Sequence, residues 1–211
     1  MKPFTKIEGV AAALRLDNVD TDVIIPMDAL LSRPRDELGK YAFEPLRYKP
    51  GGSESADFVL NKPVYRKASI LIAGRNFGCG SSREGAVHAL AGFGVRAVIA
   101  PTYGDIFYSN CIKNGVLPVR LNVETVHAVM DAADEAAGAA PFRVDLVSQT
   151  VMAPGMAPVS FDFDPALKQR LIDGEDEVAM TLRHQAAIRA WQTQDRSTRS
   201  WAWTVLEGYR Q

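Results

Sequence analysis

The sequence predicts an α/β fold: a central, mostly parallel sheet flanked by helices, with a small antiparallel hairpin region after it. Apolar runs at 68–74, 96–101 and 116–120 alternate with helical patterns, and continuous runs of this kind are typical of strands buried on both faces. The strand–helix order implies parallel pairing through right-handed crossovers. Residues 142–153 and 157–164 alternate apolar and polar side chains instead, which indicates half-buried antiparallel strands.

Two segments ahead of the sheet carry shorter signals. A short apolar run, Val23 to Ile25, ends at Pro26. It predicts a short buried strand or the entrance to one. Residues 44–63 are rich in Pro, Gly and Ser and show little periodicity. We expect a long surface loop there, and loops of that length inside a domain tend to be functional or mobile.

Helices are predicted from periodicity together with their start and stop signals. Ser81 or Ser82 can cap the first of them, Asn122 caps another, and Asp164 is followed by a proline at the first helical position. A polar break follows the last helix. The predicted helices cover 81–90, 102–115, 123–138, 165–172 and 183–192.

The tail of the chain alternates large apolar residues with polar ones. Trp201, Trp203 and Val205 stand on alternate positions, which predicts a strand-like apolar edge covered by this domain or by a partner. Aromatic residues more often fill cores than bind ligands, so we interpret these tryptophans as packing residues.

Composition limits the classes of partner. The chain has 211 residues, which favours one domain, and a formal net charge of −1 without any block of Lys or Arg. Nucleic acids and anionic membranes are therefore poor candidates, and a small neutral or acidic ligand fits better. We also expect a cytoplasmic protein, because no apolar run approaches the ~18 residues of a membrane span and the first residues lack the apolar core of a signal peptide.

Metal binding by this chain alone is not expected. Cys79 and Cys111 are its only cysteines, which is too few for a disulfide framework or a cysteine-ligated metal site. The histidines, His88, His127 and His184, show no metal-ligand spacing. Another chain would have to hold any iron–sulfur cluster.

The stretch "AGRNFGCGSSREGAVHAL", residues 73–90, concentrates glycines and polar side chains, and three known loop types fail there. A phosphate-binding P-loop needs a lysine after the glycines, and this stretch has none. A dinucleotide fingerprint needs glycine where Arg83 stands. A nucleophile elbow needs glycine where Glu84 stands.

The general physics of the stretch leaves two interpretations open. A strand that leads through glycines into a helix directs several backbone N–H groups, and the positive end of the helix dipole, toward one spot. Ser81, Ser82 and Arg83 lie at that spot, so they can bind a carboxylate and lower the proton affinity of a serine. Alternatively, the serines only cap the helix and Arg83 pairs with Glu84 or with solvent.

Four strings then follow one another along the chain: "TDVIIP" at 21–26, "NFGCGSSRE" at 76–84, "VIAPTYGDIFYSNCIKNGVLPV" at 98–119 and "TLRHQAAIRA" at 181–190. Together they resemble the family of 3-isopropylmalate dehydratase small subunits, which corresponds to the mobile last domain of aconitase. The resemblance runs from Ile7 to Trp191, and the second string is highly specific to this superfamily. It implies a swivelling β/β/α domain over 1–192 and a C-terminal tail over 193–211.

The resemblance also implies a heteromeric hydro-lyase. In this family the small subunit is inactive by itself and closes over a large subunit that carries a [4Fe–4S] cluster, one iron of which acts as a Lewis acid on the substrate. A serine alkoxide removes a proton from the adjacent carbon, water leaves, and readdition isomerises 2-isopropylmalate to 3-isopropylmalate in leucine biosynthesis. This chain's own cysteines suit that division, since they are too few to hold the cluster.

By motif position, the resemblance implies that Ser81 is the base and that Asp22 shapes the acid–base network, although Asp22 could instead only cap the turn before a strand. It implies substrate binding by four residues: Ser82, Arg83, Arg35 and the alternative Arg33. Cys79 becomes a small side chain in a crowded turn, because relatives can carry glutamate there. Cys111 is interpreted as core.

Departures from the family keep other substrates and functions open. The family usually continues "SSREHAPWAL", whereas this chain has Gly85, Val87 and His88, and Met27 and Asp28 replace part of "IIPKQFL". Glycine in the first turn of a helix costs up to about 1 kcal/mol relative to alanine. His88 either fills the space of the missing histidine or has no role.

Citraconate/2-methylmalate and dimethylmaleate therefore stay open as substrates. Two further hypotheses are an anion-binding regulatory module without catalysis, and a serine hydrolase acting through Ser81 or Ser82.

Overall fold

A computed structural model describes residues 1–81 and 83–203. The chain divides into two compact units, Met1–Gly174 and Glu175–Gln211. The boundary implied by the resemblance, after residue 192, falls inside α9 (Gln185–Thr198) and stays a prediction. Both sheets lie in the first unit.

The parallel sheet contains the three predicted strands and one more. Its strands are β2 (Ala11–Leu14), β3 (Ile70–Ala73), β4 (Ala97–Ala100) and β5 (Leu117–Arg120), and they lie side by side in that order, all parallel. The predicted parallel pairing is therefore confirmed. Consecutive strands are neighbours, so the loops that leave their carboxyl ends all begin at one edge of the sheet.

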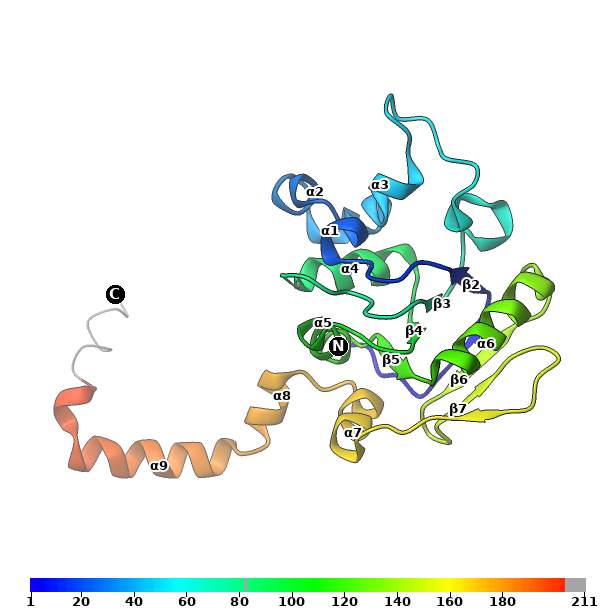
Figure 1. Ribbon diagram of the computed structural model, residues 1–211. Helices are drawn as coiled ribbons and strands as arrows, with labels where there is room; N and C mark the ends of the chain where they lie inside the picture. Colours follow the sequence, from blue (N-terminus) through cyan, green and yellow to red (C-terminus); the bar gives the residue numbers. More distant parts are fainter. Residues whose placement is uncertain (82, 204–211) are drawn as a thin grey trace. The chain divides into compact units, whose positions relative to one another are not determined.

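Each face of this sheet belongs to its own core. Leu71 and Val98 face α4 (Glu84–Phe93), whereas their neighbours in the strands face α6 (Val123–Ala136), because successive strand residues point to opposite faces. Figure 1 shows α1, α2 and α3 beyond α4, on the side away from α6. Between β4 and β5 the chain forms α5 (Asp105–Lys113).

The predicted antiparallel region is confirmed as a second sheet. Its strands are β1 (Lys6–Gly9), β6 (Phe142–Asp145), β7 (Thr150–Met152) and β8 (Val159–Ser160), in the order β1-β6-β7-β8. Strand β6 shows the expected alternation, with its two hydrophobic residues buried and the two polar ones half-buried. The hydrophobic residues of this sheet complete the core that contains α6.

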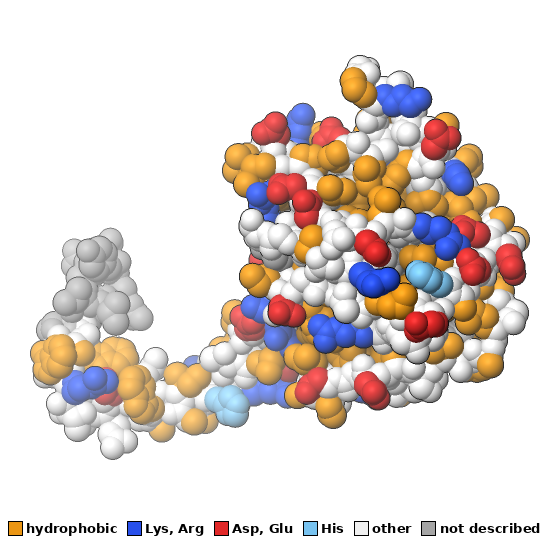
Figure 2. All heavy atoms as spheres, in the orientation of Figure 1, with side chains coloured by type: hydrophobic (Ala, Val, Ile, Leu, Met, Phe, Trp, Pro, Cys, Tyr) orange, Lys and Arg blue, Asp and Glu red, His pale blue; other side chains and the backbone are white. Residues whose placement is uncertain are grey.

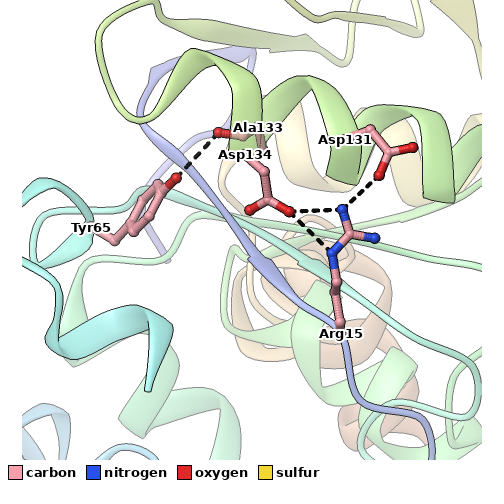
Figure 3. A network of polar contacts seen from close by, with 5 residues as sticks. All are labelled: Arg15, Tyr65, Asp131, Ala133 and Asp134. Carbon is pink, nitrogen blue, oxygen red and sulfur yellow. Dashed lines mark hydrogen bonds and ion pairs between the residues drawn. The ribbon is translucent and has the colours of Figure 1, made fainter. Parts of the chain in front are cut away.

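A polar network ties α6 to the first half of the chain (Figure 3). Arg15, just beyond β2, donates from Nε to Asp134 at 3.0 Å and from its terminal nitrogen to Asp131 at 2.6 Å. The Tyr65 hydroxyl donates to the Ala133 carbonyl at 3.2 Å. Because the three charged side chains are about half exposed, the ion pairs contribute little to the stability of the fold.

The segment before β3 differs from its prediction. Residues 23–25 are not a strand: Asp20 caps the one-turn helix α1 (Thr21–Ile24) by accepting from the Val23 N–H at 2.8 Å. The segment 44–63, expected to be a loop, contains short helical turns at both ends. The elements that follow α1 are α2 (Met27–Ser32), η1 (Arg35–Tyr41), α3 (Glu44–Arg47), η2 (Val59–Asn61) and η3 (Pro63–Tyr65).

The later helix starts are mostly confirmed. Asn122 caps α6, and Asp164 caps α7 (Pro165–Asp173). The capping role expected of Ser81 is wrong, because α4 begins at Glu84 with Arg83 at the N-cap position and no side-chain cap. Ser82 lies outside the described residues.

The second unit is helical over its described part. Besides α9 it contains α8 (Glu177–Leu182) and η4 (Ser200–Ala202), so the polar break expected after 192 is wrong. The strand-like tail is also wrong for Trp201 and Trp203: the Trp203 indole donates to Asp195 at 2.9 Å, which requires the chain to turn back on α9. Val205 lies outside the described residues.

Candidate functional site

The loops that follow β2 and β3 are joined by backbone hydrogen bonds where the sheet ends. The two loops therefore continue side by side beyond the strands, and they carry Asp22 and Ser81 a few residues later. The bonds run from Asn18 N to Arg75 O at 2.8 Å, from Gly78 N to Val19 O at 2.7 Å and from Thr21 N to Cys79 O at 3.2 Å.

Two glycines allow the glycine-rich loop to lie close to the start of α5. Gly78 has φ of +71°, and a Cβ there would lie inside the van der Waals envelope of the Phe107 ring. A Cβ at Gly104 would lie 3.1 Å from the Cys79 Cα. The glycine-rich loop is thus held against the start of α5 with no room for side chains at these two positions.

Asp22 and Arg83 form an ion pair although 61 positions separate them in the chain. Asp22 lies in the first turn of α1, and Arg83 stands immediately before α4. The structural roles that the sequence offered for them are wrong: Asp20, not Asp22, caps the turn, and Arg83 pairs with Asp22 rather than with Glu84. The Arg83 side chain is only 24% exposed, so its charge is held in place.

Ser81 lies in an exposed bend two residues before Arg83. It follows Gly80, whose φ of +83° turns the chain out of the glycine-rich loop. Cys79, two residues earlier, is half-buried, and its backbone is paired with the loop after β2. Cys111 is buried, and burial raises the pKa of its thiol well above the usual value, which agrees with a core residue.

Of the two further arginines, Arg33 follows α2 directly and Arg35 is the first residue of η1. The Arg35 guanidinium donates to the Asn114 side-chain oxygen at 3.3 Å, and the Asn114 amide donates to Glu84 at 2.9 Å. Arg35 is therefore connected to the first residue of α4. Arg33 stacks over the Tyr41 ring at 5.2 Å.

His88 lies beside this connection, facing Glu84 at 3.9 Å. Burial, and secondly the charge of Arg35, lower the pKa of His88, while Glu84 opposes that shift. The hollow next to it has a volume of about 580 Å³ and is lined by Lys2, Arg35, Asp36, His88, Ala91, Gly92 and Asn114. Sequence reasoning missed Asn114, whose only signal was its place in the string "SNCIKNGV" at the end of a predicted helix.

The face of the molecule shown in Figure 2 carries acidic and basic side chains interspersed with hydrophobic ones, in agreement with the net charge of −1. Among residues 1–81 and 83–203, no three His, Cys, Asp or Glu side chains gather as metal ligands would. The helices in the same part of the chain are too short or too polar to cross a membrane.

Comparison with known proteins gives consistent matches. Residues 1–124 match the family model of the aconitase C-terminal domain. The 3-isopropylmalate dehydratase small subunit of Rhodopseudomonas palustris is 48% identical over 202 residues, which is 96% of this chain and 100% of that protein. The protein of the same name from Nitrobacter hamburgensis is 46% identical over 202 residues, which is again 96% of this chain and 100% of that protein.

A solved structure agrees with these sequence matches. The crystal structure of a 3-isopropylmalate dehydratase from Methanocaldococcus jannaschii superimposes with a TM-score of 0.63 and 26% identity. The superposition covers 89% of this chain and 99% of the other.

Proposed function

Because the chain belongs to the family of 3-isopropylmalate dehydratase small subunits, we propose that it is one half of a hydro-lyase that interconverts 2-isopropylmalate and 3-isopropylmalate. The observation that carries this proposal is the Asp22–Arg83 ion pair beside Ser81. Three residues that the resemblance implicates come from two distant parts of the sequence, and the fold brings them to one edge of the parallel sheet. The same proposal places the chain in leucine biosynthesis in the cytoplasm.

Arg83 suits one carboxylate of such a diacid. Asp22 accepts from one terminal nitrogen of the guanidinium, which leaves its other donors for a second carboxylate. A planar guanidinium can hold a carboxylate through two parallel hydrogen bonds, so it fixes orientation as well as position. Asp22 in turn keeps the side chain of Arg83 from moving freely in solvent.

Ser81 suits the proton transfer. Its oxygen, as an alkoxide, takes the proton from the carbon next to the one that bears the hydroxyl. The electron pair of the broken C–H bond becomes the second bond of the C=C double bond while the hydroxyl leaves. Because Ser81 is exposed in this chain, its hydroxyl would stay neutral in water. A partner that covers the loop would exclude water and so strengthen the attraction between an alkoxide and the positive charges around it.

The residues of this chain do not fit an iron–sulfur cluster of its own. Cys79 and Cys111 are its two cysteines, and Cys111 is buried in the core. We therefore place the [4Fe–4S] cluster, which would supply Lewis-acid chemistry, on the large-subunit partner. The role of this chain is then to present Ser81, Asp22 and Arg83 to a diacid bound at that partner. Ser82, Arg35 and Arg33 stay proposed as substrate-binding residues.

Reconstitution tests the proposal. The chain is mixed with the cluster-bearing large subunit from the same genome, and hydration and dehydration are followed for isopropylmalate and for 2-methylmalate. We expect activity only in the mixture, and a fall in kcat of about 10²–10⁴-fold for Ser81→Ala, since a positioned proton-transfer group contributes that much. Cys79→Ser is the matched control and should stay within about threefold of wild type, as expected for a packing residue.

Three outcomes would contradict parts of the proposal. Full turnover of Ser81→Ala would remove Ser81 as the base. Loss of turnover in Cys79→Ser alone would move the chemistry to the cysteine. Diacid binding by the isolated chain, without activity in any mixture, would favour the anion-binding regulatory module.

A further inference from the structure

The space next to Gly85 is occupied by a residue from another helix. A Cβ at position 85 would meet the side chain of Leu30, with Leu30 Cγ at 3.3 Å, Cδ1 at 3.4 Å and Cδ2 closer still. Gly85 lies in the first turn of α4, and Leu30 lies in α2. The absence of a side chain at Gly85 therefore lets Leu30 of α2 rest directly on the start of α4.

Leu30 explains why a glycine is tolerated in this first turn. His88, which the sequence offered as the residue that fills the space, instead faces Glu84. Leu30 is partly buried and packs against the core that contains α4, so a side chain at position 85 would displace the end of Leu30 from this packing. The helix propensity lost at Gly85 is offset by this apolar contact.

The segment that begins with α2 is attached to α4 at a second point. Arg35, at the start of η1, reaches Glu84 through the side chain of Asn114. Arg33 lies between the two attachments, three residues after Leu30. The start of this segment is therefore held against α4 by one apolar contact and one polar connection. Further along, the backbones of Gly39 in η1 and Gly92 in α4 pack directly against each other.

We infer that the contact between Leu30 and Gly85 positions the arginines of the α2–η1 segment relative to Arg83, and so determines how tightly a diacid is held. The inference rests on the proposed function. A short diacid presents two carboxylates within a narrow range of separations, and two arginines bind both only when their spacing falls in that range. The ligand class is a short hydroxydicarboxylate. Leu30 and Gly85 are positioning residues, because they act through the arginines rather than on the substrate.

Enlarging the side chain at position 85 and shortening the one at position 30 tests the inference. Gly85→Ala, Leu30→Ala and the double variant are each reconstituted with the large subunit, and KM and kcat are measured separately for isopropylmalate. Gly85→Ala should raise KM about tenfold or more while kcat changes less than about twofold, because displaced binding groups weaken ground-state and transition-state binding alike. Adding Leu30→Ala should bring KM back to within about threefold of wild type, since it removes the overlap.

The outcomes separate the inference from the proposed function. An active wild-type pair with an unchanged KM in Gly85→Ala would overturn the inference alone, because Leu30 would then have moved without moving the arginines. An increase in KM that the double variant does not reverse would also overturn it, as would loss of kcat in Gly85→Ala. An inactive wild-type pair would overturn the proposed function and the positioning role with it.

Discussion

Gly78 and Gly80 form a matched pair in which the cost of packing can be measured apart from the cost of backbone conformation. Both have positive φ, +71° and +83°. An added Cβ at Gly78 overlaps the buried Phe107 ring. At Gly80, among the residues that the structure describes, it meets only the Asp20 Cβ, at an ordinary contact distance of 3.6 Å. Substitution by alanine therefore strains the backbone at both positions and crowds the core at one.

The magnitudes follow from these two differences. An L-residue in the left-handed region costs roughly 1–2 kcal/mol, partly offset by the reduced entropy of the unfolded chain, roughly 0.4–1 kcal/mol. Overpacking a filled core adds roughly 1–3 kcal/mol. We expect Gly80→Ala to lower the free energy of unfolding by about 1 kcal/mol and Gly78→Ala by about 2–4 kcal/mol.

Urea unfolding of the full chain, followed by circular dichroism, measures this difference. Tryptophan fluorescence would not, because all three tryptophans lie in Glu175–Gln211, outside the unit that contains both glycines. Equal losses in the two variants would refute the reasoning, since the contact with Phe107 would then contribute nothing. A smaller loss for Gly78→Ala than for Gly80→Ala would refute it as well.

Two further predictions concern single side chains. Burial and Arg35 hold the pKa of His88 below its value in the unfolded chain. As the pH is lowered through about 6.5, the unfolded state therefore binds more protons than the folded state, and the free energy of unfolding decreases. His88→Gln should flatten this decline in the urea midpoint, and parallel pH profiles for both proteins would contradict the explanation. The Tyr103 hydroxyl lies 2.7 Å from the Val98 carbonyl and 2.8 Å from that of Val119, so Tyr103→Phe should cost about 1–2 kcal/mol in thermal unfolding. An unchanged melting temperature would show that these carbonyls do not need it.

The sequence was sufficient where the signal is local. The apolar runs that became β3, β4 and β5 are buried almost throughout, so no solvent-facing residue interrupts them. Asn122 and Asp164 cap the helices that they precede, because capping depends on residues two or three positions away.

Predictions from local sequence patterns were wrong where contacts with other parts of the chain determine the secondary structure. The β-branched run at 23–25 became the end of a helix because Asp20 caps it and the core buries Ile24 and Ile25 completely. The segment after residue 192 stays helical, with Asp195 bound by Arg199 and Trp203. Periodicity carries no trace of such partners.

The candidate site depended on the fold in the same way. Nothing in the spacing of the chain indicates that Asp22 meets Arg83, or that Leu30 rests on Gly85. The resemblance identified the first pair as residues of one site, without their ion pair. The second pair came from the structure alone.

The hydrogen bonds between the loops after β2 and β3 also bear on how a moving domain would work. Gly78 bonds to Val19, and Thr21 bonds to Cys79, so the residues that lead to Asp22 and to Ser81 are fastened to each other as well as to the sheet. Their mutual geometry is an outcome of folding and does not have to be rebuilt in each catalytic cycle. If this domain swings toward a partner, as the resemblance implies, only the distance and angle between the two subunits would have to change.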